Sequence, residues 1–227
     1  MRLNPEIQEV TLVLVGNFSP AAMTPAWMSH YELISEQEAT GAEVTVVHPE
    51  ATQYKLDWAE IYIDQNRVQI KTAQAPWVRI SDFAVRLLRD VLPSTPVKAF
   101  GINRSAHYPT SPAQQNHIGE KLAPREFWGE WGKSLHNEKK QLSGLVSIRM
   151  RQGEGFDDRE EGSLDLIVQA SSALKPGAIA ITANDHFEVG EHHSALPAAE
   201  LIERVFENSI RRSDSIMSTV ISGNLPS

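Results

Sequence analysis

The strongest constraint on the fold lies in residues 95–104, near the middle of the chain. This segment begins at Thr95-Pro96, continues as a short apolar run and ends at the polar pair Asn103-Arg104, which is typical of a strand. The helices and strands predicted before this segment are repeated after it in loosely the same order. We therefore predict two related halves that join at this strand.

The first half is predicted as strand, helix, three strands and helix. Its first strand is the continuous apolar run over residues 10–15, and Thr24 caps a helix over residues 25–35 that has Pro25 in the first helical position. Strands are predicted over residues 44–47, 56–63 and 67–72. A hairpin loop at residues 64–66 joins the last two, and Ser81 caps a helix that ends before Pro93.

The second half repeats this order after the central strand. A polar loop is predicted over residues 105–117, and a helix that begins at Pro124 carries Phe127, Trp128, Trp131 and Leu135. The remaining predicted elements are strands over residues 145–150, 164–169 and 178–182, and a long amphipathic helix that begins at Pro197.

This pattern predicts an α+β fold in which each half is strand, helix, three strands and helix. The sheets are expected to be mainly antiparallel, with helices packed on one face. The domain boundaries that follow are residues 1–94 for the first half and 95–227 for the second, or one continuous domain if the sheets join edge to edge.

Composition excludes several classes of function. The formal net charge of −8 argues against nucleic-acid binding, because neutralisation of phosphates supplies most of that affinity. The absence of cysteine excludes disulfides, thiolate nucleophiles and cysteine-based metal centres. The polar N-terminal residues and the lack of an apolar run of roughly 20 residues favour a soluble cytoplasmic protein that does not enter a membrane.

Several short phrases together resemble a family of uncharacterised bacterial proteins of similar length. They are residues 16–20 with 25–27, residues 100–103, residues 122–124 with Trp128, and residues 184–187. The resemblance covers most of the chain. It implies a bacterial cytoplasmic protein and brings no activity, cofactor or catalytic residue with it.

A dense set of imidazoles and carboxylates, Asp185, His186, His192 and His193, is a candidate metal site. Adjacent histidines point apart in an extended segment, and the helical spacing of a zinc protease is absent. The alternative interpretation is a polar strand end followed by a loop, and it is the one that we favour. No cofactor is therefore predicted.

The histidines at positions 107, 117 and 136, with Asn103 and Arg104, are a second candidate, for acid–base chemistry on a phosphate ester. Solvated histidines are the simpler interpretation. The acidic segment 153–162 lacks the residue order of a calcium-binding loop, so it is predicted to be a solvated, mobile loop. The tryptophans at positions 27, 128 and 131 are predicted to pack in the core, with ligand lining as the alternative.

Two functional hypotheses follow. The favoured one is a non-enzymatic interaction or scaffolding protein, a homo-oligomer or a subunit of a larger bacterial complex. Its partner surface would be the end of the last helix, with Ile216, Met217, Val220 and Ile221. The alternative is an enzyme or a small-ligand or metal-binding protein with its site between the halves, near Asn103, Arg104, His107, Asp185 and His186.

Overall fold

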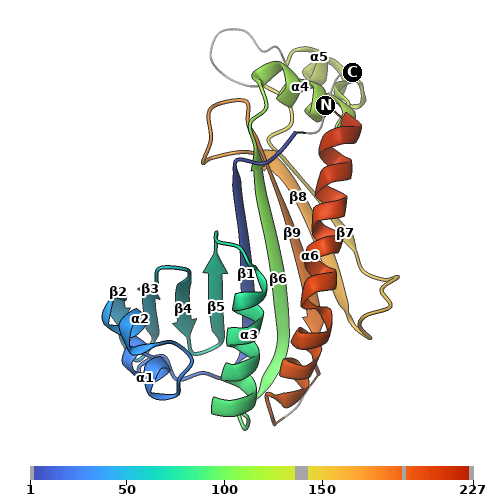
Figure 1. The fold of residues 1–227 in the computed structure, drawn as a ribbon. Helices are drawn as coiled ribbons and strands as arrows, with labels where there is room; N and C mark the ends of the chain where they lie inside the picture. Colours follow the sequence, from blue (N-terminus) through green and yellow to red (C-terminus); the bar gives the residue numbers. More distant parts are fainter. Residues whose placement is uncertain (1–2, 136–142, 191–192, 225–227) are drawn as a thin grey trace.

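The structure is a computed structural model that describes residues 3–135, 143–190 and 193–224. Its main feature is one antiparallel sheet, whose described strands follow the order β2-β3-β4-β5-β1-β6-β9-β8-β7 (Figure 1). The strands are β1 (Ile7–Gly16), β2 (Glu43–Val47), β3 (Ala51–Lys55), β4 (Glu60–Asp64), β5 (Arg67–Thr72), β6 (Val97–Tyr108), β7 (Ser147–Gln152), β8 (Gly162–Ala170) and β9 (Ile179–Glu188). The segments before and after residue 95 meet where β1 pairs with β6.

The longer helices cover one face of this sheet, where α3 and α6 lie side by side (Figure 1). The described helices are α1 (Pro25–His30), α2 (Glu36–Thr40), α3 (Val78–Arg86) with its π-helical continuation η1 (Leu87–Val91), α4 (Pro112–Leu122), the 3-10 turn η2 (Arg125–Trp128), α5 (Gly129–Lys133) and α6 (Leu196–Asn224). No described helix is both long enough and apolar enough to span a membrane.

The core forms because alternate residues of each strand face the helices. In β1, Val10, Leu12 and Leu14 are completely buried, whereas the residues between them point to the other face. Phe100 of β6 and Phe187 of β9 are register partners, and their rings stack with centroids 4.8 Å apart. These residues belong to one large apolar cluster that also contains buried side chains of α3 and of the first half of α6.

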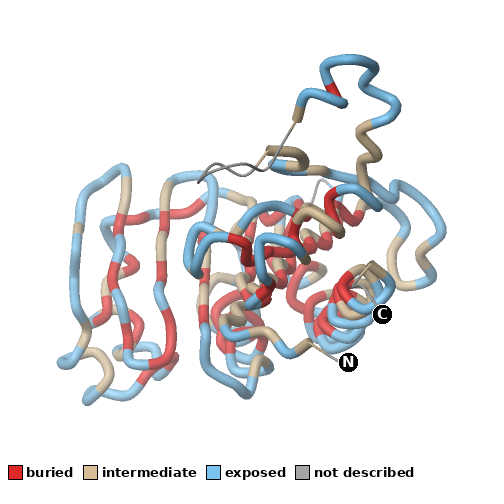
Figure 2. The backbone as a smooth tube through the Cα atoms, turned by 90° about the horizontal axis from the view of Figure 1, so that it is seen from above, coloured by how far each residue is buried: buried red, intermediate tan, exposed pale blue. Residues whose placement is uncertain are grey.

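A second, smaller cluster lies where the last turns of α6 cross β6, β8 and β9. Met217 and Ile221 of α6 pack there against Ile181 of β9 and Val168 of β8. A helix of 29 residues therefore spans both clusters. Figure 2 shows buried residues along α6 and the central strands, with mostly exposed backbone in the outer loops.

The opposite face of the sheet carries a polar row that crosses six strands. The strand registers align its members, which are Lys71, Thr11, Asn103, Asn184, Asp165 and Arg151. We call this face the uncovered face, because none of the described helices packs on it in Figure 1.

The predicted α+β class, with a large antiparallel sheet and helices, is confirmed. The predicted hairpin at residues 64–66 and the Thr24 cap are also present: Asp64 Oδ1 accepts hydrogen bonds from the backbone of Asn66 and Arg67, and Thr24 Oγ1 accepts one from Trp27 N. The relation between the two halves by duplication stays a prediction.

The first half differs from the prediction in several places. Strand β3 was not predicted, so four strands, not three, lie between the first helices and α3. Residues 56–63 do not form one strand, because Leu56 N donates to Ala59 O in a turn that separates β3 from β4. The predicted helix over residues 25–35 is interrupted near Glu32, whose φ of 56° is left-handed. Ser81 is not a cap, because α3 already begins at Val78 and buries Ser81.

The predicted polar loop over residues 105–117 was wrong. β6 continues to Tyr108, because Ser105 and His107 pair with β9, and Ser105 Oγ lies 3.1 Å from Thr182 Oγ1. Helix α4 then begins at Pro112, and the hydroxyl of the preceding Ser111 accepts from Gln114 N in a capping box. The polar residues 105–108 suggested a loop, but their pairing with β9 makes them part of a strand.

Candidate functional site

The sheet separates the residues of the predicted cleft onto two faces. Asn103 lies opposite Asn184 and, with His107 and His186, belongs to the uncovered face. Arg104 and Asp185 occupy the alternate positions and are buried under α6. The five residues therefore do not converge on one cleft.

Arg104 is held by its own chain. Its Nε lies 2.8 Å from Asp214 Oδ1 of α6, its Nη1 donates to the carbonyls of Ser105 and Glu9, and its Nη2 donates to Gln8 Oε1. The guanidinium of Arg104 therefore links β1, β6 and α6 through these contacts. This arrangement accounts for its burial without a ligand.

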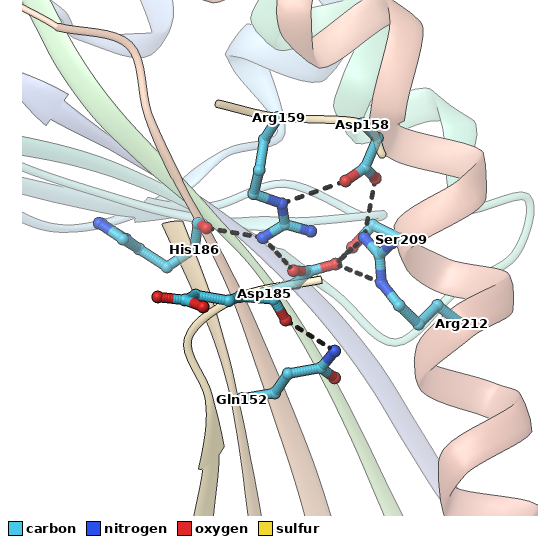
Figure 3. A network of polar contacts seen from close by, with 8 residues as sticks. Gln152, Asp158, Arg159, Asp185, His186, Ser209 and Arg212 are labelled. Atoms are coloured by element: carbon cyan, nitrogen blue, oxygen red, sulfur yellow. Dashed lines mark hydrogen bonds and ion pairs between the residues drawn. The ribbon is translucent and has the colours of Figure 1, made fainter. Parts of the chain in front are cut away.

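Asp185 lies at the centre of a buried ionic network, which we call the Asp185 network (Figure 3). Its members are Asp158, Arg159, Asp185, Ser209 and Arg212. Asp185 accepts from Ser209 Oγ at 2.7 Å and pairs with Arg159 at 2.6 Å and Arg212 at 2.6 Å. Asp158 pairs with the same two arginines, at 3.1 and 2.9 Å.

The network contains two carboxylates and two guanidiniums, so its charges balance. Burial by itself would raise the pKa of Asp158, but the hydrogen bonds and positive charges of Arg212 and Arg159 hold that pKa below its ordinary value. Arg159 also lies over the Phe187 ring at 3.7 Å. A balanced, enclosed group of this kind is typical of a structural tie, here between the segment before β8, strand β9 and helix α6.

This network corrects the interpretation of residues 153–162 as a wholly solvated, mobile loop. Asp158 and Arg159 leave the solvent and bond to α6 and β9, and Arg159 Nη1 also donates to the carbonyl of His186. Asp158 is accommodated beside the buried Asp185 because Arg159 of the segment and Arg212 of α6 pair with both carboxylates.

The candidate metal residues do not gather. His186 Nε2 lies 2.7 Å from Glu188 Oε1 on the uncovered face, while Asp185 points to the opposite face and His193 is exposed. His192 falls outside the described residues. Within residues 3–135, 143–190 and 193–224, no group of three or more potential ligands could hold a metal ion.

The second histidine set is also dispersed. His107 Nδ1 lies 2.8 Å from Ser171 Oγ at one end of β6, and His117 is half-buried on α4. His136 lies outside the described residues. The two described histidines of this set therefore sit on separate elements, without Arg104 beside them.

The end of α6 is used largely within the chain. Met217 and Ile221, two of the four residues of the predicted partner surface, are buried in the second cluster. Ile216 and Val220 are half-buried. Ile216 follows Arg212 by one turn, and Arg212 bonds to Asp185, so Ile216 lies on the side of α6 that faces strand β9.

The most exposed large apolar side chains lie on η2, on α5, and in or directly before β7. We call Phe127, Trp128 and Trp131 the aromatic cluster; they are exposed by 80%, 58% and 61%, respectively. The rings of Trp128 and Trp131 meet edge to face, with centroids 5.7 Å apart. Trp128 and Trp131, together with residues 145–147, line a cleft of about 210 Å³.

The prediction that Trp128 and Trp131 pack in the core was wrong. The expected single helix is instead a 3-10 turn and a five-residue helix, separated where Gly129 adopts a φ of 60°. Apolar residues at helical spacing then do not share one buried stripe. Trp27 is partly buried and packs against the main core, as predicted.

Arg125 fixes the base of the aromatic cluster. Its Nη1 donates to Leu135 O at 2.7 Å, its Nη2 donates to Asn116 Oδ1 of α4, and its Nε lies 3.0 Å from Glu120 Oε2. These bonds tie η2 to α4. The tryptophans are therefore presented from an anchored turn, and a rigid aromatic surface loses little entropy when it binds.

Strand β7 continues this exposed surface. It is the last strand of the sheet, and its Met150 is 67% exposed. Arg149 and Arg151 project on the uncovered face, where both pair with Asp165 of β8. The hydrogen bond from Arg151 and the charges of the two arginines hold the pKa of Asp165 far below its ordinary value, although burial opposes this.

Sequence reasoning missed Arg149, Met150 and Arg151, although a signal was present. Their alternation of cation, apolar residue and cation, at the end of the strand predicted over residues 145–150, indicates an edge strand with one charged face. The two glycines at positions 129 and 132 likewise argue against a long helix carrying the tryptophans.

The sequence was also compared with known proteins. No protein-family model matches the chain, and no curated protein shows significant similarity to it.

Proposed function

We propose that this chain is a non-enzymatic interaction or scaffolding protein of the bacterial cytoplasm, which works as a subunit of a protein complex. The observation that carries the proposal is the aromatic cluster, in which the rings of Trp128 and Trp131 lie against each other and Phe127 is also exposed, on turns that Arg125 anchors. Tryptophan is enriched among residues that dominate binding energy at protein interfaces. The exposed Val146 and Met150 extend this surface onto β7.

This proposal places the partner surface at the aromatic cluster and β7, not at the end of α6. Met217 and Ile221 are unavailable because they pack inside the chain, Val220 packs against the same cluster, and Ile216 is half-buried. The two halves of the chain also share an arrangement of strands. In each, the first strand pairs with the last, which leaves β2 and β7 at the two margins; we infer that the halves are related by duplication.

The test compares complexes formed by the wild type, the double variant Trp128→Ser/Trp131→Ser and the control Tyr31→Ser. Tyr31 is also an exposed aromatic residue, but it lies at the other end of the sheet, after α1. Each tagged full chain is purified from the cells that naturally produce it, and its mass is measured by native mass spectrometry.

We expect a stoichiometric complex for the wild type and for Tyr31→Ser, and free chain for the tryptophan variant. A wild-type chain that stays monomeric, or a complex that survives loss of both tryptophans, would contradict the proposal. Circular dichroism of the three proteins checks that the folds are equal.

One observation favours small-ligand binding as a second candidate. Asn184 Oδ1 on the uncovered face is buried without a hydrogen-bond partner in the described structure, and it lies beside Gly101, where an added Cβ would come within 3.3 Å of it. A ligand that donates a hydrogen bond would satisfy it. Native mass spectrometry that finds a small molecule on the wild type, but not on Asn184→Ala, would support this candidate.

A further inference from the structure

The outer edge of β7 presents a row of backbone groups. Ala170 N donates to Val146 O, and the register of β7 against β8 continues from this pair. Because antiparallel strands alternate between bonded and non-bonded pairs, the backbone groups of Ile148 and Met150 face β8, and those of Ser147, Arg149 and Arg151 face outward. Among the described residues, no loop or turn hydrogen-bonds to these three outward-facing backbone positions.

The side chains of β7 give the two faces of this edge different chemistry. Arg149 and Arg151 are 56% and 61% exposed on the uncovered face, and they share the single carboxylate of Asp165. Two cations against one anion leave one positive charge in excess. On the opposite face, the exposed Met150 lies beside the half-buried Ile148.

We propose that β7 is the docking edge for an extended segment of a partner protein, which adds to the sheet as a further strand. The segment carries carboxylates on the side that meets Arg149 and Arg151 and apolar side chains on the side that meets Met150. This inference rests on the proposed function and specifies the partner's chemistry. Backbone hydrogen bonds supply affinity in such strand addition, and alternate side chains supply specificity.

A second copy of the chain fits this edge poorly. Two β7 strands paired around a two-fold axis bring the arginines of both copies together, and like charges on facing strands are destabilising. The opposite margin, β2, offers Glu43 as its one charged residue, and that residue already lies opposite Lys55. The charge of β7 therefore selects an acidic partner segment.

The probe is a labelled peptide in which glutamate and valine alternate, with serines at both ends. One control peptide replaces every glutamate by lysine, and another keeps the composition but places the glutamates together, which removes the alternation. Binding to the full chain is followed by fluorescence anisotropy at low and high salt. We expect the alternating acidic peptide to bind most tightly, by about tenfold over either control, with weaker binding at high salt.

Two substitutions at Ser147 separate strand addition from simple charge attraction. Ser147→Pro removes one outward N–H but keeps both arginines, whereas Ser147→Ala keeps the backbone donor. We expect about tenfold weaker binding for Ser147→Pro, corresponding to one lost hydrogen bond, and unchanged binding for Ser147→Ala. Equal thermal unfolding of the two variants shows that the edge remains folded.

A third variant tests the charge. Arg149→Gln lowers the positive charge while Arg151 still pairs with Asp165, so we expect weaker binding of the acidic peptide and a smaller dependence on salt.

Binding of the lysine peptide with equal affinity, equal binding by Ser147→Pro and Ser147→Ala, or no peptide binding at all would overturn the inference. These failures are distinct from failure of the proposed function. If the natural complex depends on Trp128 and Trp131 but the acidic peptide does not bind, the interaction function stands and strand addition at β7 is wrong.

Discussion

Two arginine–aspartate groups lie on opposite faces of the same sheet, and their difference separates a structural role from a binding role. In the Asp185 network, two carboxylates balance two guanidiniums, and Asp185 and Arg159 are almost completely enclosed. In the β7 group, Arg149 and Arg151 share Asp165 and remain more than half exposed. A balanced, enclosed group stabilises the fold, whereas an unbalanced, exposed group is available to a partner.

The largest effect is expected from Asp185→Asn. This change leaves Arg159 and Arg212 with only Asp158, so a positive charge stays buried without compensation. We expect the free energy of unfolding to fall by roughly 3–5 kcal/mol, measured by urea denaturation. The double variant Asp185→Asn/Arg159→Gln should recover part of this loss. A single variant as stable as the wild type would show that the network is not a structural tie.

The second-largest effect on stability is expected at low pH, where the carboxylates of both arginine–aspartate groups become protonated. The pKa values of Asp158 and Asp165 lie below the ordinary value of 3.8, so each carboxylate contributes stability that is fully present above that value. The contribution is lost as the pH falls through the lowered pKa. We therefore expect the free energy of unfolding to decrease below about pH 4, and less steeply in Asp158→Asn. Parallel curves for wild type and variant would contradict the role of Asp158.

Asp165→Asn should distinguish the two groups most directly. It removes the carboxylate that Arg149 and Arg151 share, but these arginines retain water, so the loss of stability should be clearly smaller than for Asp185→Asn. The freed charge should tighten binding of the alternating acidic peptide by about threefold. Anisotropy titrations of the wild type and the variant measure this, and weaker binding would mean that Asp165 positions the arginines.

The smallest effect on stability is expected at the aromatic cluster. Trp128→Ser/Trp131→Ser changes side chains that are mostly exposed, so the free energy of unfolding should change by no more than about 0.5 kcal/mol. The same variant is expected to lose the natural complex. A large loss of stability in urea would instead assign the tryptophans a packing role.

Helices, strands and turns could be predicted from the sequence where they depend on side-chain periodicity or on a few neighbouring residues. The apolar run of β1, the Asp64 hairpin and the stripe of α6 follow from side-chain periodicity and turn chemistry. Polarity misled at residues 105–108, because β1 and β9 supply partners from distant parts of the chain. The tryptophans misled because one glycine with positive φ breaks the helix that their spacing suggested.

The sequence by itself determined that this is an α+β chain with a long amphipathic last helix and without cysteine chemistry. Only the tertiary structure decided which charges meet, because strand register places Asn103 and Asp185 on opposite faces although both belong to the same pair of strands. It likewise decided that Met217 is buried and Trp128 exposed. Burial and charge pairing depend on contacts between residues far apart in the chain, which periodicity cannot specify.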